Sequence, residues 1–208
     1  MYSEGDYDLA GFAIGAVERG KVLTSVAAAA GDIVLGLASA GLHSNGFSLV
    51  RRVVAATGAD LQAPAPFDDA RRLGDALLEP TRIYVKSCLD AARAGGVKAF
   101  AHITGGGLID NVPRVLPENT VARLEAAAWE IPAVFRWLAS AGGVAVEDMG
   151  RTFNCGIGMV LVCAPDDTER LSEILRENGE AVSVIGRIEA GSGEAACVIE
   201  GAEIRWRG

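Results

Sequence analysis

The sequence lacks several features that mark common classes of protein. It has no basic excess: 19 Lys and Arg stand against 27 Asp and Glu, which gives a formal net charge of −8. Because nucleic-acid binding needs a basic surface, we exclude a nucleic-acid partner. No uninterrupted apolar run approaches the roughly 18 residues of a membrane-spanning helix. The acidic start has no apolar targeting core, so we expect a cytoplasmic protein without a membrane partner.

Cysteine is scarce as well. The four cysteines show no C-x-x-C spacing and lie near no histidine pair, so the pattern predicts reduced, mostly buried thiols and no metal site. Cys155 is the one candidate for a reactive thiol because it borders a polar turn. No activating base is adjacent to it in the sequence, which favours an inert thiol.

Only two histidines are present, and both stand among hydroxyls and glycines. His43 lies in the segment 41–46, and His102 begins the segment 102–107. Backbone that is rich in glycine exposes N–H groups, which bind anions and small polar molecules. We therefore interpret the two clusters as halves of one site.

Hydrophobic periodicity predicts alternating strands and helices. The length suits one large domain or two small ones, with enough chain to bury a sizeable core. The mixture of hairpin-like and helix-linked strands predicts an α+β fold in which helices cover a mixed sheet. The predicted strands are 9–17, 33–37, 97–103, 157–163, 181–188, 196–199 and 202–206; the helices are 47–58, 80–95, 108–112, 132–140 and 166–178; 59–69 is a loop, and 121–127 is open between strand and helix.

The segment Thr104-Gly105-Gly106-Gly107 follows a predicted strand and precedes a helix, as a phosphate-binding turn would. It matches neither a Walker A loop nor G-x-G-x-x-G. A tight turn that needs positive φ is the alternative. His102 stands at the same turn, where it could donate to an anion or carry a proton, or serve as a structural hydrogen-bonding residue.

The second cluster places Ser39, His43, Ser44 and Asn45 after a predicted strand. Ser44 or Asn45 could cap the following helix, but capping does not account for all four side chains. We expect them to line a pocket. A Ser-His nucleophile is disfavoured because no G-x-S-x-G elbow is present. The segment 151–156 either walls the site or forms a turn, and a structural role is favoured.

These motifs together resemble the C-terminal half of aminoimidazole ribonucleotide synthetase, also called phosphoribosylformylglycinamidine cyclo-ligase. The resemblance covers essentially the whole chain, and it is specific because six segments occur in register. Ala40 and Phe47 depart from it, since serine and tyrosine are common there. The segments are 7–12 (YDLAGF), 36–39 (GLAS), 43–46 (HSNG), 80–85 (PTRIYV), 102–107 (HITGGG) and 151–156 (RTFNCG).

The resemblance implies an activity and a fold. The family cyclises formylglycinamidine ribonucleotide to aminoimidazole ribonucleotide in purine biosynthesis, with ATP and Mg²⁺, and is typically a homodimer. Its C-terminal domain is a layered α/β/α fold, partly ferredoxin-like. The implied catalytic residues are His102 and His43. The implied substrate-binding residues are Ser39, Ser44, Asn45, Thr104, Gly105, Gly106 and Gly107.

Family members carry an ATP-binding domain before the part that this chain resembles. We therefore expect residues 1–10 to be a linker from such a domain, and 11–208 to be the C-terminal, substrate-side domain. By this interpretation the chain is inactive by itself and holds neither ATP nor Mg²⁺. Two alternatives stay open: another member of the same ATP-binding superfamily, and a non-catalytic module that binds a phosphoribosyl metabolite.

Overall fold

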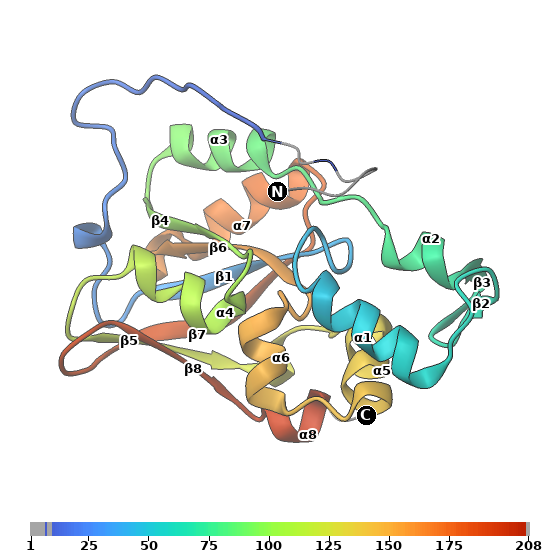
Figure 1. The fold of residues 1–208 in the computed structure, drawn as a ribbon. Helices are drawn as coiled ribbons and strands as arrows, with labels where there is room; N and C mark the ends of the chain where they lie inside the picture. Colours follow the sequence, from blue (N-terminus) through green and yellow to red (C-terminus); the bar gives the residue numbers. More distant parts are fainter. Residues whose placement is uncertain (1–6, 8–9, 207–208) are drawn as a thin grey trace.

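The computed structural model describes residue 7 and residues 10–206, without the side chains of 204 and 205. Its centre is a six-stranded mixed sheet in the order β4-β6-β1-β7-β5-β8 (Figure 1). β5 and β8 pair in parallel, and the other neighbours pair antiparallel. The strands are β1 (Ile33–Ala38), β4 (Val97–His102), β5 (Thr120–Glu125), β6 (Ile157–Cys163), β7 (Val182–Ala190) and β8 (Ala196–Glu200).

Two helices cover one face of this sheet. They are α3 (Val85–Ala94) and α7 (Thr168–Glu177), which contact each other (Figure 1). Side chains of a strand alternate between the two faces. In β1, Leu35 therefore packs beneath these helices with Leu171, whereas Val34 belongs to the core on the opposite face.

The opposite face holds the larger core. It is covered by α1 (Phe47–Thr57), α4 (Gly107–Asn111), α5 (Ala133–Gly142), α6 (Val146–Thr152) and α8 (Ala202–Trp206) (Figure 1). Phe135, Phe153 and Trp206 are its largest fully buried side chains. Helices on both faces give the layered α/β/α fold that the sequence predicts.

The chain order β1-α3-β4-β6-α7-β7 reproduces the ferredoxin arrangement. Its four strands lie in the order β4-β6-β1-β7, and both connecting helices lie on one face. The expectation of a partly ferredoxin-like sheet is therefore confirmed. β5 and β8 extend this unit beyond β7.

Several local predictions differ from the structure. Residues 10–17 form no strand and are exposed, because no neighbouring strand pairs with them among the described residues; Leu9 lies outside these residues. Residues 202–206 are helix α8, since Trp206 is buried against the α-helical layer. The predicted loop 59–69 contains β2 (Pro64–Ala65) and the start of β3 (Asp68–Arg72), which lead into α2 (Leu73–Leu77).

Helix α3 begins at Val85, five residues after Pro80. The segment 80–84 is irregular because its backbone and side chains bond to other parts of the chain. The open segment 121–127 is strand as far as Glu125, in β5, which pairs with a strand on each side. Its last two residues belong to a short 3-10 helix, Ala126–Ala128. Helices α2 and α6 have no counterpart among the predicted elements.

Candidate functional site

Tyr84 joins the two histidine clusters. It stands directly before α3, with its ring centre 6.2 Å from that of His43 and 6.3 Å from that of His102. Its hydroxyl donates a 2.8 Å hydrogen bond to the carbonyl of Ala38 at the end of β1. Segments that lie about 60 residues apart in the sequence thus meet on one buried aromatic ring, as the interpretation of two half-sites requires.

His43 is buried and held in a strained conformation. Its φ is 58°, in the left-handed region that non-glycine residues seldom adopt. Its Nε2 accepts hydrogen bonds from the backbone N–H groups of Ala40 (3.1 Å) and Arg82 (3.4 Å). An imidazole nitrogen that accepts carries no proton, so the proton of neutral His43 is on Nδ1. That Nδ1 is buried and has no partner among the described residues.

His43 is therefore suited to donate a hydrogen bond and unsuited to take up a proton. Burial, and to a smaller extent the charges of His102 and Arg82, together lower the pKa of His43 to about 4. At neutral pH the ring is uncharged. Because Nε2 already accepts two hydrogen bonds, the structure favours a positioning role for this histidine over a general-base role.

Gly158 in β6 makes the close packing of these rings possible. A Cβ at this position would lie 2.1 Å from the Tyr84 hydroxyl oxygen and 2.6 Å from Cε1 of His43. No other residue type leaves that space. Gly46 is a second glycine that close packing requires in this cluster, because a Cβ there would lie 2.3 Å from the Phe153 ring.

The irregular segment 80–84 is fixed by a buried carboxylate. Glu180, between α7 and β7, pairs with Nε of Arg82 at 2.8 Å and accepts a 2.8 Å hydrogen bond from the Ser87 hydroxyl. Ser87 lies in the first turn of α3 and also bonds to the Tyr84 carbonyl. This network holds the Arg82 N–H and the Tyr84 ring in place beside His43.

The remaining residues of the His43 cluster reach the same region. The Ser44 hydroxyl lies 3.0 Å from that of Thr81. Oδ1 of Asn45 lies 3.6 Å from where a Cβ on Gly105 would stand, so the two predicted clusters meet at this point. Helix α1 begins after Gly46 with no side-chain cap, so neither Ser44 nor Asn45 is used for capping.

The triple-glycine turn is braced from within. The Asn111 amide donates to the carbonyls of Gly105 (3.2 Å) and Gly107 (2.8 Å), and the Thr104 hydroxyl bonds to its Oδ1 at 3.3 Å. Gly107 has a φ of 58°, and a Cβ there would lie 2.0 Å from the Gly150 carbonyl oxygen. Positive φ and close packing therefore account for Gly107, as the alternative for this turn anticipated.

Charge at this turn is balanced by an ion pair. Asp110 lies close to Gly106: a Cβ added to Gly106 would stand 2.8 Å from the Cβ of Asp110. Arg151 at the end of α6 pairs with Asp110 at 2.7 Å. Arg151 is therefore the cation that offsets the charge of Asp110 beside this turn.

Asn154 ties the segment 151–156 to the loop after β1. Its Oδ1 accepts from the Ser39 hydroxyl (2.9 Å) and the Gly156 N–H (2.8 Å), and its amide donates to the Gly41 carbonyl (2.8 Å). The structural role favoured for this segment is thereby supported. Ser39 lines a separate cavity of about 370 Å³ with Trp129. Burial raises the pKa of Cys155, in agreement with an inert thiol.

An open cavity of about 480 Å³ lies beside His102. Its polar groups come from Thr81, Arg82, Tyr84 and His102, and its apolar wall includes Phe100 and Met159. His102 is exposed to this space, whereas His43 lies buried behind Tyr84. The geometry thus separates an accessible histidine from a buried one.

Sequence reasoning missed four residues of this site: Arg82, Tyr84, Asn111 and Glu180. Arg82 and Tyr84 lie in one of the motifs that carry the resemblance, and that was their only signal. Asn111 is one helical turn past the glycines, and its bonds to their carbonyls appear only in the folded chain. Glu180 gave no signal, because it stands 98 residues from the arginine it pairs with.

Comparison with known proteins now decides the family. The model of the family "AIR synthase related protein, C-terminal domain" matches residues 29–198. The chain belongs to this family. The match includes both histidine clusters, the segment 80–84 and Asn154.

Solved structures of several proteins share the fold. Thiamine-monophosphate kinase from Stenotrophomonas maltophilia K279a is 21% identical with a TM-score of 0.60, over 89% of this chain and 55% of that one. E. coli HypE, a hydrogenase maturation protein, is 17% identical with a TM-score of 0.58, over 90% and 51%. T. maritima PurL in complex with ADP is 12% identical with a TM-score of 0.50, over 89% and 26%. The chain thus spans about half the length of the first two and about a quarter of the third.

Two further observations concern the described residues alone. They contain no group of three or more His, Cys, Asp or Glu side chains that could hold a metal ion. None of their helices is long and apolar enough to cross a membrane.

Proposed function

We propose that this AIR synthase-related domain is the substrate-side part of an ATP-dependent cyclo-ligase that converts formylglycinamidine ribonucleotide to aminoimidazole ribonucleotide. The observation that carries the proposal is the meeting of both histidine clusters at Tyr84. Two polar clusters separated in sequence are brought to one place, beside a cavity large enough for a small molecule. The family match supports an enzyme of the AIR synthase-related group, and the six motifs in register are the reason for proposing this reaction within it.

In this proposal the domain binds and orients the ribonucleotide. Gly105, Gly106 and Gly107 hold the ribose 5-phosphate, with Arg151 as the nearby cation. Thr104, Ser44 and Asn45 supply hydroxyl and amide groups for the rest of the substrate. The reaction needs a fixed geometry and neutralisation of charge at a phosphorylated oxygen, and such donors supply both.

The two histidines take different roles. His102 faces the open cavity and is the one that contacts the formyl and amidine groups. His43 acts from behind through Tyr84 and the Arg82 N–H, because its own ring is buried. Ser39 acts indirectly as well, since its hydroxyl bonds to Asn154.

ATP, with Mg²⁺, would activate the formyl oxygen, and a second domain of the whole protein would bind it. The structure of T. maritima PurL with ADP supports nucleotide use by the whole protein. Ile83, Val85 and Leu89 are large apolar side chains exposed beside the His102 cavity. We propose that this patch is covered in the full-length protein, by the nucleotide domain or by a second copy in a homodimer.

Calorimetry with the 208-residue chain tests the binding half of this proposal. Formylglycinamidine ribonucleotide should bind without ATP, and ATP alone should not bind. Hydrolysis of ATP by this chain alone would contradict the division of roles. Binding of a different phosphorylated small molecule in preference to the ribonucleotide would indicate another member of the superfamily.

A variant of the full-length enzyme tests the catalytic half. His102→Ala should lower kcat/KM by about 100-fold, the size expected for a group that contacts the reacting atoms. The matched control is Glu173→Gln, at an exposed position of α7 away from both clusters. Equal kinetics in His102→Ala and the control would refute the role of His102. Ribonucleotide binding without any turnover in the full-length protein would identify a binding module.

A further inference from the structure

A third cavity, of about 570 Å³, lies away from the histidines between α6 and the edge strand β8. It shares no lining residue with the His102 cavity. Its volume falls within the range of pockets for small organic molecules, roughly 300–1,000 Å³. The proposed function leaves this cavity without a role.

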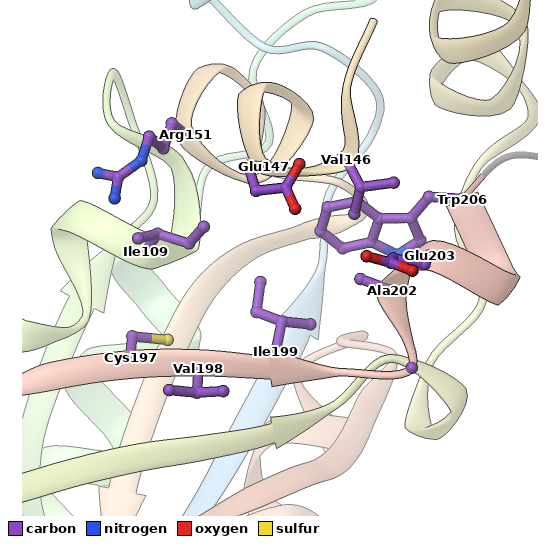
Figure 2. A pocket seen from close by; sticks show the side chains of 11 residues that line it. Ile109, Val146, Glu147, Arg151, Cys197, Val198, Ile199, Ala202, Glu203 and Trp206 are labelled. Carbon is purple, nitrogen blue, oxygen red and sulfur yellow. The ribbon is translucent and has the colours of Figure 1, made fainter.

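The walls of this cavity are largely apolar. Figure 2 shows Ile109 and the Trp206 indole on opposite sides, with Ile199 and Cys197 of β8 beneath them. Burial raises the pKa of the Cys197 thiol to about 12, so it carries no charge here. A ligand therefore needs a hydrocarbon body.

Two carboxylates give the cavity a negative charge. Glu147 comes from the first turn of α6 and Glu203 from α8, and Figure 2 shows the Glu147 carboxylate directed into the space between Ile109 and Trp206. Among the described side chains, neither glutamate forms an ion pair, whereas Arg151 at the rim is paired with Asp110. A cationic group on the ligand would complete this arrangement.

The Trp206 indole adds a second, independent requirement. The side chain is 2% exposed, and its Nε1–H is buried with no acceptor among the described residues. A buried donor without an acceptor is costly, because it loses its hydrogen bonds to water and gains none. An oxygen atom on a bound molecule would satisfy it, and the indole ring would also attract a cation.

We propose that this cavity binds an amphipathic amine that carries an oxygen acceptor. The hydrocarbon body would pack between Ile109 and Ile199, the ammonium group would bond to Glu147 and Glu203, and the oxygen would accept from the Trp206 indole. Each part of the ligand matches one property of the cavity. The hydrocarbon body matches the apolar walls, the ammonium group the unpaired carboxylates, and the oxygen atom the indole N–H that lacks an acceptor. Arg151 at the rim also belongs to the proposed phosphate turn, but the ligand proposed for this cavity does not depend on the proposed reaction.

Three probes of similar size separate these requirements: 2-amino-1-phenylethanol, 2-phenylethylamine without the hydroxyl, and 1-phenylethanol without the amine. Binding to the 208-residue chain is measured by two-dimensional ¹H–¹⁵N NMR, through the Trp206 indole resonance, which Trp206→Phe assigns. We expect the amino alcohol to bind best. Loss of the amine should weaken binding about tenfold, the effect of one charge-assisted hydrogen bond.

Variants test the same assignment. Glu147→Gln should weaken amine binding about tenfold and leave that of 1-phenylethanol unchanged, while Glu173→Gln should change neither. Glu147 and Glu173 are both exposed, so we expect both variants to fold, and their amide spectra check this. The proposal is overturned if no probe shifts the indole resonance at millimolar concentration, if 1-phenylethanol binds as well as the amines, or if Glu147→Gln binds amines like the unsubstituted chain.

Discussion

Acid should destabilise this domain through His43. The folded chain resists protonation of this ring until a pH of about 4, whereas the unfolded chain protonates it near its ordinary pKa of 6.5. Between these values the unfolded state binds more protons, so the free energy of unfolding falls as the pH is lowered from 6.5 to about 4 and then levels off. The contribution of His43 is fully present above pH 6.5.

The magnitude follows from the difference between the two pKa values. One unit corresponds to 1.36 kcal/mol, so the whole shift is worth about 3 kcal/mol, and about 2 kcal/mol of it is lost at pH 5. The ring is 5% exposed, so solvent screens little of this effect. With a urea m-value of about 2 kcal/mol/M, the midpoint of unfolding should fall by about 1 M between pH 7.5 and pH 5.

Urea unfolding of three proteins at both pH values isolates this effect from the titration of carboxylates. His43→Asn removes the titrating group, and asparagine tolerates the left-handed φ of this position. His102→Asn removes the exposed histidine, and with it one of the charges that lower the pKa of His43. The pH-dependent loss should be about 2 kcal/mol smaller in His43→Asn than in the unsubstituted chain. It should be reduced by less in His102→Asn, because burial, the largest cause of the shift, remains. An equal loss in all three proteins would falsify the assignment to His43.

Two further substitutions test how the site is held together. Gly158→Ala should lower the free energy of unfolding by about 1–3 kcal/mol, because the new methyl group must displace the Tyr84 hydroxyl from the Ala38 carbonyl. Thermal unfolding measures this loss. The control is Gly11→Ala, where a Cβ meets nothing within 4 Å, and an equal cost in the two variants would contradict the prediction. Asn154→Ala should cost about 2–4 kcal/mol and weaken ribonucleotide binding, because it leaves several buried polar groups unpaired. Denaturant unfolding measures the loss of stability, and calorimetry measures the loss of binding. Unchanged stability of Asn154→Ala would show that these hydrogen bonds do not stabilise the fold.

The local hydrophobic pattern of the sequence predicts most strands of the sheet, and its polar clusters predict part of the candidate site. Strands β1, β4, β6 and β7 were predictable because their apolar runs are short and bounded by glycine or proline. The failures have a common cause. Residues 10–17 alternate like a strand, but a strand needs a neighbour to pair with, and residues 202–206 became helix because Trp206 has a place in the helical layer.

The sequence by itself determined which side chains we propose for the site, because histidines, hydroxyls and glycines cluster within a few residues of one another at 41–46 and 102–107. Tertiary structure alone decided how they work. It buried His43 behind Tyr84 and left His102 open. It also fixed the surroundings of His43 from distant parts of the chain, with Glu180 bonded to Arg82 and Asn154 bonded to the loop after β1. Burial and long-range pairing depend on how the sheet brings strands together, and local sequence carries no record of either.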